Sequence, residues 1–332
     1  MSVTFESVPL GYSGVARPGH AWTERRSRLK FSFAGVLLFS VNLRALVREA
    51  PVFGISPDGA ADPPDHASIP PGVRAVRVRS LPVKRHIPRV SFLSSWIRYA
   101  PAQYRRFYVE IDRTFEAYLS KFSSKSRNTL RRKVRQFTEG STGDTGLREF
   151  RTPEEIRLFH RLAHSISKTT YQHQLLDAGI PNTPEFETEL GTLASRDVVR
   201  GYILQHSGNP VAYALCHRVE DTLVYDRTGF NPRHGNRHPG TVLIYLLLQH
   251  LFEQNEMSRF DFGPGEFGYK EYFATGDVLC ADIYYFPRTL ANYSLVAAHA
   301  SLEAITRTGK FLLDRLGWTS RIKKMVHRVL CR

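Results

Sequence analysis

The stretch from residue 198 to residue 255 constrains the fold more than any other part of the chain. Apolar runs alternate there with turn residues, which predicts three consecutive antiparallel strands, Val198–Gln205, Val211–Val219 and Thr222–Phe230. The helix expected next, Gly240–Asn255, is apolar on nearly every side, so most of its faces must be covered. This combination predicts a sheet with at least one helix buried against it.

Further helices and strands are expected on both sides of this stretch. Helices are expected to begin at Ser123 or Ser124, at Thr152 and at Thr183, where capping residues precede an apolar stripe. The later elements are a buried strand, a glycine-rich turn, a short helix and a last strand, at Arg259–Phe262, Gly263–Gly268, Tyr269–Ala274 and Val278–Phe286. The order predicts an α+β fold with a mixed, mostly antiparallel central sheet flanked by helices, and excludes eight βα units or a doubly wound sheet.

The first 110 residues carry weaker signals. Phe31–Val47 is apolar without a clean helix or strand period, and Pro51–Pro71 is rich in turn residues, which predicts a long loop. Apolar residues alternate with arginines over Val73–Arg79, which favours a basic edge strand. We therefore expect a basic N-terminal region over residues 1–110, a folded domain over residues 111–290 and a basic helical extension over residues 291–332.

Composition narrows the class of protein. With 42% hydrophobic and 23% charged residues, the chain of 332 residues is of a globular type. Its apolar stretches are too short to span a bilayer, and no basic segment followed by an apolar one marks a secretory signal, so we expect a cytoplasmic protein. Cys216, Cys280 and Cys331 are odd in number and widely spaced, which predicts neither disulfides nor a zinc site.

The net charge of +15 is unevenly distributed. Residues 17–137 hold 24 Lys and Arg against 8 Asp and Glu, residues 138–290 hold 14 against 20, and residues 291–332 hold 8 against 2. Such basic flanks suit a nucleic acid, an anionic glycan precursor or a membrane surface as partner. Solvated helix faces are the alternative explanation.

A polar, cationic loop before the apolar helix is a candidate anion site. Residues 231–238 are small, polar or cationic, and the helix beginning at Pro239 has no acid in its first turn. Exposed N–H groups at such a helix start can hold a phosphate. The alternative is a surface loop with incidental cations. The candidate ligands are Arg233, Asn236, Arg237, His238, Gly240 and Thr241.

A second group of polar residues follows the strand Arg259–Phe262. Asp261 lies between two phenylalanines, and Glu266 and Lys270 follow in and after the glycine-rich turn. A carboxylate and a lysine at a strand end can position an amine, accept its proton or balance an anion. Alternatively, Asp261 caps the turn while Glu266 and Lys270 form a surface pair.

These segments together resemble a known family. The sequence resembles the CelD/BcsL-type acetyltransferases of the GNAT superfamily, which are related to the FemAB aminoacyltransferases, over roughly residues 110–286. The segments that carry the resemblance are 118–132, 201–218 with Gly208-Asn209-Pro210-Val211-Ala212, 225–230, Pro239-Gly240 and 261–270 with Asp261-Phe262-Gly263-Pro264-Gly265-Glu266 and Tyr269-Lys270.

The resemblance implies acyl-CoA (acetyl-CoA) as co-substrate and no metal. The acyl-CoA would lie between a central strand and the following helix, whose N-terminus takes the diphosphate; the usual phosphate-loop spacing is only loosely matched by residues 233–240. The strand residues implied to contact it are Arg227, Thr228, Gly229 and Phe230. Residues 20–110 would be a degenerate first half if the chain has the tandem arrangement of the FemAB enzymes.

The mechanism implied is direct transfer to an amine. Asp261 or Glu266 would be the base or would anchor the amine, and Tyr269 or Tyr225 would give a proton to the departing thiolate. A covalent route through Cys216 is the alternative, although no histidine and acid partner is specified for it. The acceptor expected is an amine-bearing small molecule or sugar precursor, in cell-envelope or exopolysaccharide biosynthesis.

The basic flanks keep other functions open. The helix beginning near Ser124 is basic, which would serve a FemAB-like use of aminoacyl-tRNA. The cations around its apolar stripe are Arg127, Arg131, Arg132, Lys133 and Arg135. A third alternative is a non-catalytic protein that binds polyanions or membranes. At the C-terminus, the segment after Trp318 has the pattern of a short basic amphipathic helix, which would lie at the inner face of the membrane or dock onto the protein itself.

Overall fold

The computed structural model describes residues 22–33, 36–50, 52–53, 63–65, 68–169 and 179–315. These residues form two compact units. Unit 1 contains the described residues of Ala16–Arg105 and Val278–Arg332, and unit 2 those of Arg106–Asp277. The chain thus returns to unit 1 at its end, a grouping that differs from the consecutive regions expected from the sequence.

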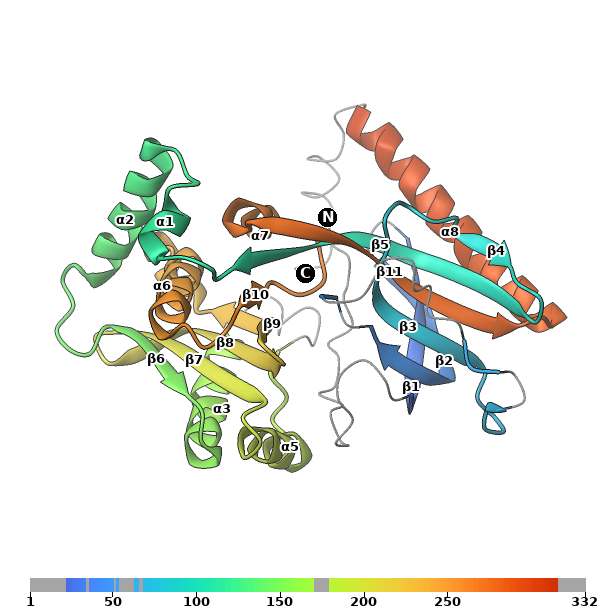
Figure 1. The fold of residues 1–332 in the computed structure, drawn as a ribbon, viewed down its shortest axis with the longest axis horizontal. Helices are drawn as coiled ribbons and strands as arrows, with labels where there is room; N and C mark the ends of the chain where they lie inside the picture. The colour runs from blue at the N-terminus through green and yellow to red at the C-terminus, as the bar shows by residue number, and fades with distance from the viewer. Residues whose placement is uncertain are drawn as a thin grey trace, which may run out of the picture. The chain divides into compact units, whose positions relative to one another are not determined.

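Unit 2 contains a mixed sheet (Figure 1). Its strand order is β5-β10-β9-β8-β7-β6, where only the end of β5 belongs to this unit. β9 pairs with β10 in parallel, and the other pairs are antiparallel. The expected three-strand meander is confirmed as β7–β8–β9. The strands are β5 (Trp96–Glu110), β6 (Gly146–Phe150), β7 (Val199–His206), β8 (Asn209–Val219), β9 (Thr222–Phe230) and β10 (Arg259–Asp261).

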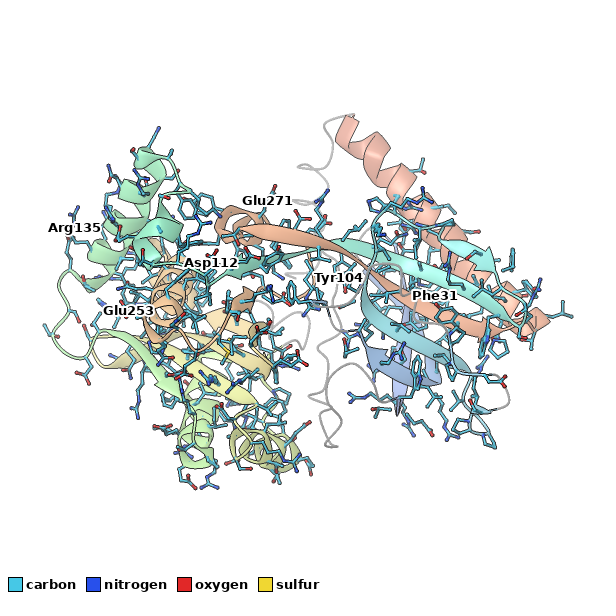
Figure 2. The ribbon with its side chains drawn as sticks, in the orientation of Figure 1. Phe31, Tyr104, Asp112, Arg135, Glu253 and Glu271 are labelled. Atoms are coloured by element: carbon cyan, nitrogen blue, oxygen red, sulfur yellow. The ribbon has the colours of Figure 1, made fainter. Side chains whose placement is uncertain are left out.

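Helices cover both faces of this sheet. α3 and α5 pack on one face, and α6 packs on the other with α1 and α2 beside it. Arg135 of α2 and Glu253 of α6 point outward (Figure 2). The expected helix starts at Ser123, Thr152 and Thr183 are N-caps, and Thr152 with Glu155 forms the capping box. The helices are α1 (Phe115–Leu119), α2 (Ser124–Thr138), α3 (Pro153–Ser167), α5 (Pro184–Ala194), the 3-10 helix η2 (Pro232–Arg237), α6 (Pro239–Gln254) and α7 (Gly268–Phe273).

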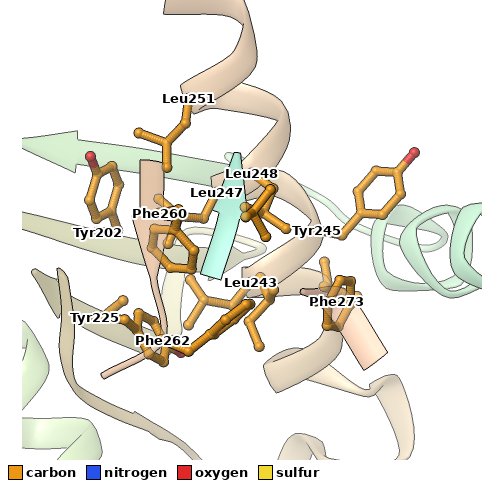
Figure 3. Close-up of a cluster of buried hydrophobic side chains, with 14 of the residues drawn as sticks. Tyr202, Tyr225, Leu243, Tyr245, Leu247, Leu248, Leu251, Phe260, Phe262 and Phe273 are labelled. Atoms are coloured by element: carbon orange, nitrogen blue, oxygen red, sulfur yellow. The ribbon is translucent and has the colours of Figure 1, made fainter. Parts of the chain in front are cut away.

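The core of unit 2 explains why α6 is apolar on nearly every side. Leu243, Leu247 and Leu251 of α6 pack against the sheet and reach Phe260 of β10, as Figure 3 shows. The opposite side of α6 is covered by α1 and α2. On the other face of the sheet, the ring of Phe159 lies against Gly201, where a side chain would not fit.

Unit 1 consists of paired strands that are covered on one face by α8 (Leu290–Arg315). Its strand order is β1-β2-β3-β11-β5, with β4 paired to β5. β1 with β2 and β3 with β11 are antiparallel, whereas β2 with β3 is parallel. The strands not yet given are β1 (Thr23–Phe33), β2 (Val36–Glu49), β3 (Ala75–Pro82), β4 (Val90–Phe92) and β11 (Gly276–Pro287).

The prediction of a basic edge strand over Val73–Arg79 is wrong in one respect. The strand exists as β3, but it lies between β2 and β11. Its cations are matched by acids from distant segments, since Arg77 pairs with Asp282 at 3.2 Å and Arg79 with Glu49 at 2.8 Å. Inner strands accept such charges because each has a specific partner.

Two further expectations concern the ends of unit 1. The stretch without a clean period, Phe31–Val47, is the end of β1 and most of β2. The segment after Trp318 lies outside the described residues, as does part of the loop expected over Pro51–Pro71. None of the described helices has the length and apolarity needed to cross a membrane.

Candidate functional site

The candidate site lies where the parallel strands β9 and β10 separate. They pair from Thr222 opposite Arg259 to Val224 opposite Asp261. Within the described residues, the rest of β9 has no partner strand on that edge. A strand edge without a partner can pair its N–H and C=O groups with an extended ligand.

Two local features cause the separation. The pairing of β8 with β9 skips one residue, because Leu215 lies opposite Arg227 and Cys216 opposite Tyr225, so that Asp226 forms a bulge. After β10 the chain turns at Gly263, which has a φ of +69° and lies so close to the carbonyl of Tyr225 that a Cβ would be 2.9 Å from its oxygen. A glycine is therefore required there.

The strand residues expected to contact acyl-CoA follow this bulge. Thr228, Gly229 and Phe230 lie on the part of β9 that β10 does not pair. Phe230 is exposed and lies next to the start of α6, where a Cβ at Gly240 would be 3.6 Å from its ring. Arg227 offers only its backbone, because its guanidinium is buried and donates to the carbonyl of Gly179.

The start of α6 has the features expected of an anion site. Its first turn contains no acid, and its N-cap His238 makes no side-chain capping bond. The N–H groups of Thr241 and Val242 donate to the carbonyl of His238. An anion would therefore be attracted mainly by the N–H group of Gly240 and by the helix dipole. Three of the residues expected as ligands, Arg233, Asn236 and His238, are exposed.

The guanidinium of Arg237 makes hydrogen bonds within the protein, to the end of α2. Its Nη1 donates to the carbonyls of Gln136 at 3.4 Å and Glu139 at 3.2 Å, at the end of α2. A cation at this position is favoured by the negative end of the α2 dipole. The expected ligand Arg237 thus joins the loop before α6 to α2.

Asp261 is buried, and both of its oxygens are occupied. Arg106 donates from Nε to Oδ2 at 2.7 Å, and the N–H of Gly263 donates to Oδ1 at 2.8 Å. Sequence reasoning missed Arg106, because nothing in the local pattern of β5 distinguishes it from Arg105. The carboxylate therefore holds the turn after β10 in place.

Lys270 closes the same turn from α7. Its ammonium donates to the carbonyls of Gly263 at 3.2 Å and Pro264 at 2.7 Å. Burial lowers the pKa of Lys270 to about 7, and the nearby Asp261 partly opposes that shift. The carboxylate of Asp261 and the ammonium of Lys270 thus stabilise the turn that separates β10 from β9.

Two tyrosines lie beside this turn. The buried Tyr225 donates from its hydroxyl to Thr228 Oγ1 at 2.7 Å, and Thr228 in turn donates to the carbonyl of Tyr213. Its ring packs against Phe262 (Figure 3). Tyr269, 38% exposed, is close enough to contribute to raising the pKa of Tyr225. Burial around the hydroxyl raises the pKa of Tyr269 to about 12, so it remains protonated at neutral pH.

The two remaining candidates differ in access. Glu266 is exposed in the turn between β10 and α7. Cys216 is buried in the core of unit 2, and burial raises the pKa of its thiol well above the ordinary value. A thiol that stays protonated is a poor nucleophile, which disfavours the covalent route. No cluster of potential metal ligands occurs among the described residues.

Comparison with known proteins identifies the domain. Residues 124–271 match the family model of the acetyltransferase (GNAT) domain, so this part of the chain, from α2 to α7, is a GNAT acetyltransferase domain. Among curated proteins, no match was found.

Several solved structures are similar to this chain. FemX is 11% identical and matches 82% of this chain and 90% of its own, with a TM-score of 0.47. L-PGS from Bacillus licheniformis is 13% identical over 67% and 71% of the two chains, with a TM-score of 0.42. A tandem GNAT protein from the clavulanic acid biosynthesis pathway is 12% identical over 65% of each chain, with a TM-score of 0.34. At TM-scores below 0.5, these likenesses carry no information about the substrate.

Proposed function

We propose that the GNAT domain transfers an acyl group from an acyl-CoA to an amine acceptor. One observation supports this most: the edge of β9 that has no partner strand in the described part of the chain leads from the bulge at Asp226 to the acid-free start of α6. An extended pantetheine can pair with such a strand edge while its diphosphate lies at the helix start. The CelD/BcsL-type assignment is part of this proposal.

The chain's own groups divide into binding and positioning roles. The backbone of residues 227–230 would hold the pantetheine, and Gly240, Arg233 and His238 would face the diphosphate. Asp261, Arg106 and Lys270 are positioning residues, because their polar groups already hold the turn after β10.

The chemistry would be direct transfer. Of the two carboxylates expected as the base, Glu266 is exposed and Asp261 is buried, so we assign to Glu266 the acceptance of the amine proton. The amine attacks the thioester carbonyl, a C–N bond forms, and a backbone N–H of β9 stabilises the oxyanion. When the C–S bond breaks, Tyr269 gives its proton to the thiolate, since its hydroxyl stays protonated.

Thermal shift and native mass spectrometry with acetyl-CoA and longer acyl-CoAs test this proposal. A ligand at about 100 times its dissociation constant stabilises the folded state by about 2.7 kcal/mol. Gly240→Ala should weaken the effect, because the added methyl group meets no protein atom closer than 3.6 Å and so acts on the ligand.

Gly191→Ala in α5 is the matched control. A Cβ there has no neighbour within 4 Å, and the residue is far from the start of α6 in sequence. Binding should be unchanged in this variant. Absence of stabilisation by any acyl-CoA would overturn the proposal.

A second candidate donor, aminoacyl-tRNA, is favoured by the basic surface of α2. Lys125, Arg131, Arg132 and Arg135 are exposed there. Two of them have acidic partners, however, as Arg131 pairs with Glu116 at 2.7 Å and Arg135 with Glu139 at 3.6 Å. This partial neutralisation makes acyl-CoA the stronger candidate. Protection of a tRNA by the protein, lost in Lys125→Glu/Arg132→Glu, would reverse the ranking.

The acceptor we propose is an amine-bearing small molecule or sugar precursor of cell-envelope or exopolysaccharide synthesis. The support is electrostatic, since the basic flanks, residues 17–137 and 291–332, would attract an anionic precursor. Release of CoA thiol from acetyl-CoA in the presence of amino sugar nucleotides, compared with simple amines, tests this choice.

A further inference from the structure

The β1–β2 hairpin of unit 1 ends in exposed apolar side chains. Phe33, Leu37, Leu38 and Phe39, here called the hairpin end, are each between 45% and 56% exposed. Large apolar side chains grouped on a surface mark sites of interaction.

The hairpin end has exposed side chains on both faces. Leu37, Leu38 and Phe39 are consecutive in β2, and neighbouring side chains of a strand point to opposite faces of a sheet. All three are more than half exposed. A protein partner docks on one face of such a ribbon, whereas lipid surrounds a ribbon that enters it from the end.

Cations lie directly behind the hairpin end. Arg26, Arg28 and Lys30 alternate along β1 with buried residues, so they share one face of the hairpin. Arg44 of β2 lies opposite Arg26. One acid, Glu24, pairs with Arg44 at 2.6 Å, which leaves an excess of positive charge beside the apolar end.

α8 supports the hairpin on one face next to this end. The ring of Phe31 stacks on Phe39 with centroids 4.4 Å apart, and His299 of α8 packs edge-on to Phe31. His299 also makes a hydrogen bond to the carbonyl of Lys30 at 3.0 Å. Thr306 donates to the carbonyl of Ser32, and its neighbour Ile305 is 58% exposed. The hairpin end is therefore presented on a fixed support.

We propose that the hairpin end inserts into an anionic membrane surface. Phe33, Leu37, Leu38 and Phe39 would enter the boundary between headgroups and acyl chains, while Arg26, Arg28 and Lys30 would lie at the level of the lipid phosphates. The charge next to the end selects an anionic bilayer over a neutral one. This docking is independent of the proposed acyl transfer and would bring the enzyme to acceptors that are attached to a membrane.

Vesicle co-sedimentation of the full chain tests the proposal. The protein should bind vesicles of phosphatidylcholine with phosphatidylglycerol and bind pure phosphatidylcholine weakly. Leu37→Ser/Leu38→Ser should reduce binding by about tenfold or more, as expected for lost apolar insertion. Arg28→Glu/Lys30→Glu should also reduce binding, and added salt should weaken the binding of the unaltered protein.

Two matched variants serve as controls. Leu290→Ser replaces an apolar residue that is 87% exposed at the start of α8, and Arg85→Glu reverses an exposed charge outside the hairpin. Both should bind like the unaltered protein. Leu38→Trp gives a gain-of-signal measurement, because its added fluorescence should be quenched by brominated lipids.

Three results would overturn the proposal. The first is no preference for anionic vesicles. The second is binding that the leucine pair does not affect, together with no quenching of Leu38→Trp, which would assign the membrane contact to another segment. The third is a dimer that Leu37→Ser/Leu38→Ser disperses without any vesicle binding, which would make a second copy of the chain the partner.

Discussion

Arg106 and Asp261, 155 positions apart in the sequence, form a buried ion pair with a distance of 2.7 Å between Nε and Oδ2. The pair joins β5 to the last residue of β10, where the parallel strands β9 and β10 separate. Arg106→Met should lower the free energy of unfolding by about 3–5 kcal/mol, because it leaves a buried carboxylate without its cation. Urea unfolding measures the change.

A double-mutant cycle provides the control for this pair. Asp261→Asn removes the charge and keeps an oxygen that can accept from Gly263. Introduced together with Arg106→Met, it should restore part of the lost stability. Strictly additive effects of the two changes would show that the residues are not coupled.

Lys270 should make stability depend on pH in the alkaline range. Its pKa is lowered from 10.5 to about 7 by burial. Below pH 7 the lysine is charged in both the folded and the unfolded protein, and the folded state bears the full cost of desolvating the charge. Between pH 7 and 10.5 the lysine loses its proton in the folded state but keeps it in the unfolded state, so that cost is relieved. The free energy of unfolding should therefore rise over this window, by at most about 1.4 kcal/mol per pH unit.

The comparison variant for this rise is Lys270→Met. Loss of the bonds to Gly263 and Pro264 lowers its stability at every pH, so the informative quantity is the slope. Equal slopes for the two proteins between pH 7 and 10 would contradict the shifted pKa.

Glu266→Gln should impair transfer without affecting stability. Loss of a general base lowers the rate by about 10²- to 10⁴-fold, while an exposed side chain contributes little to folding. The measurement is CoA thiol release from acetyl-CoA with the best amine found, together with the melting temperature. Glu271→Gln, an exposed change in α7, is the control and should keep full activity. Full activity in Glu266→Gln would remove Glu266 from the mechanism.

Gly201→Ala should destabilise unit 2. The added Cβ would lie 2.4 Å from the ring of Phe159, so α3 must move away from the sheet. Overpacking of this kind costs about 1–3 kcal/mol. Thermal unfolding should show a lower midpoint, with partial recovery when Phe159→Leu is added. An unchanged midpoint would mean that α3 does not pack on β7 as described.

Cys216 should be chemically inert in the folded protein. Its thiol is buried and its pKa is raised well above the ordinary value. Iodoacetamide should modify it only after unfolding, and Cys216→Ala should transfer acyl groups at an unchanged rate. Loss of transfer in a folded Cys216→Ala protein would support the covalent route.

Local patterns predicted much of unit 2. The capping box at Thr152 and the turns between β7, β8 and β9 depend on hydrogen bonds between residues that are close in the sequence. They can therefore be recognised in a short window of sequence. Unit 1 was harder to predict. Leu43 and Ala45 of β2 face α8, and Leu46 faces the opposite cluster, so burial on both faces removes the alternation that marks a strand.

The sequence by itself determined the α+β class, the helix starts and the acid-free start of α6, because these depend on neighbouring residues. Only the tertiary structure decided what the charged residues do. It turned Asp261 from a candidate base into the partner of Arg106, and Arg237 from a candidate phosphate ligand into a contact to the end of α2. The physical reason is that a buried charge needs a partner within hydrogen-bond distance to be stable. The fold supplies that partner from a segment that is distant in the sequence.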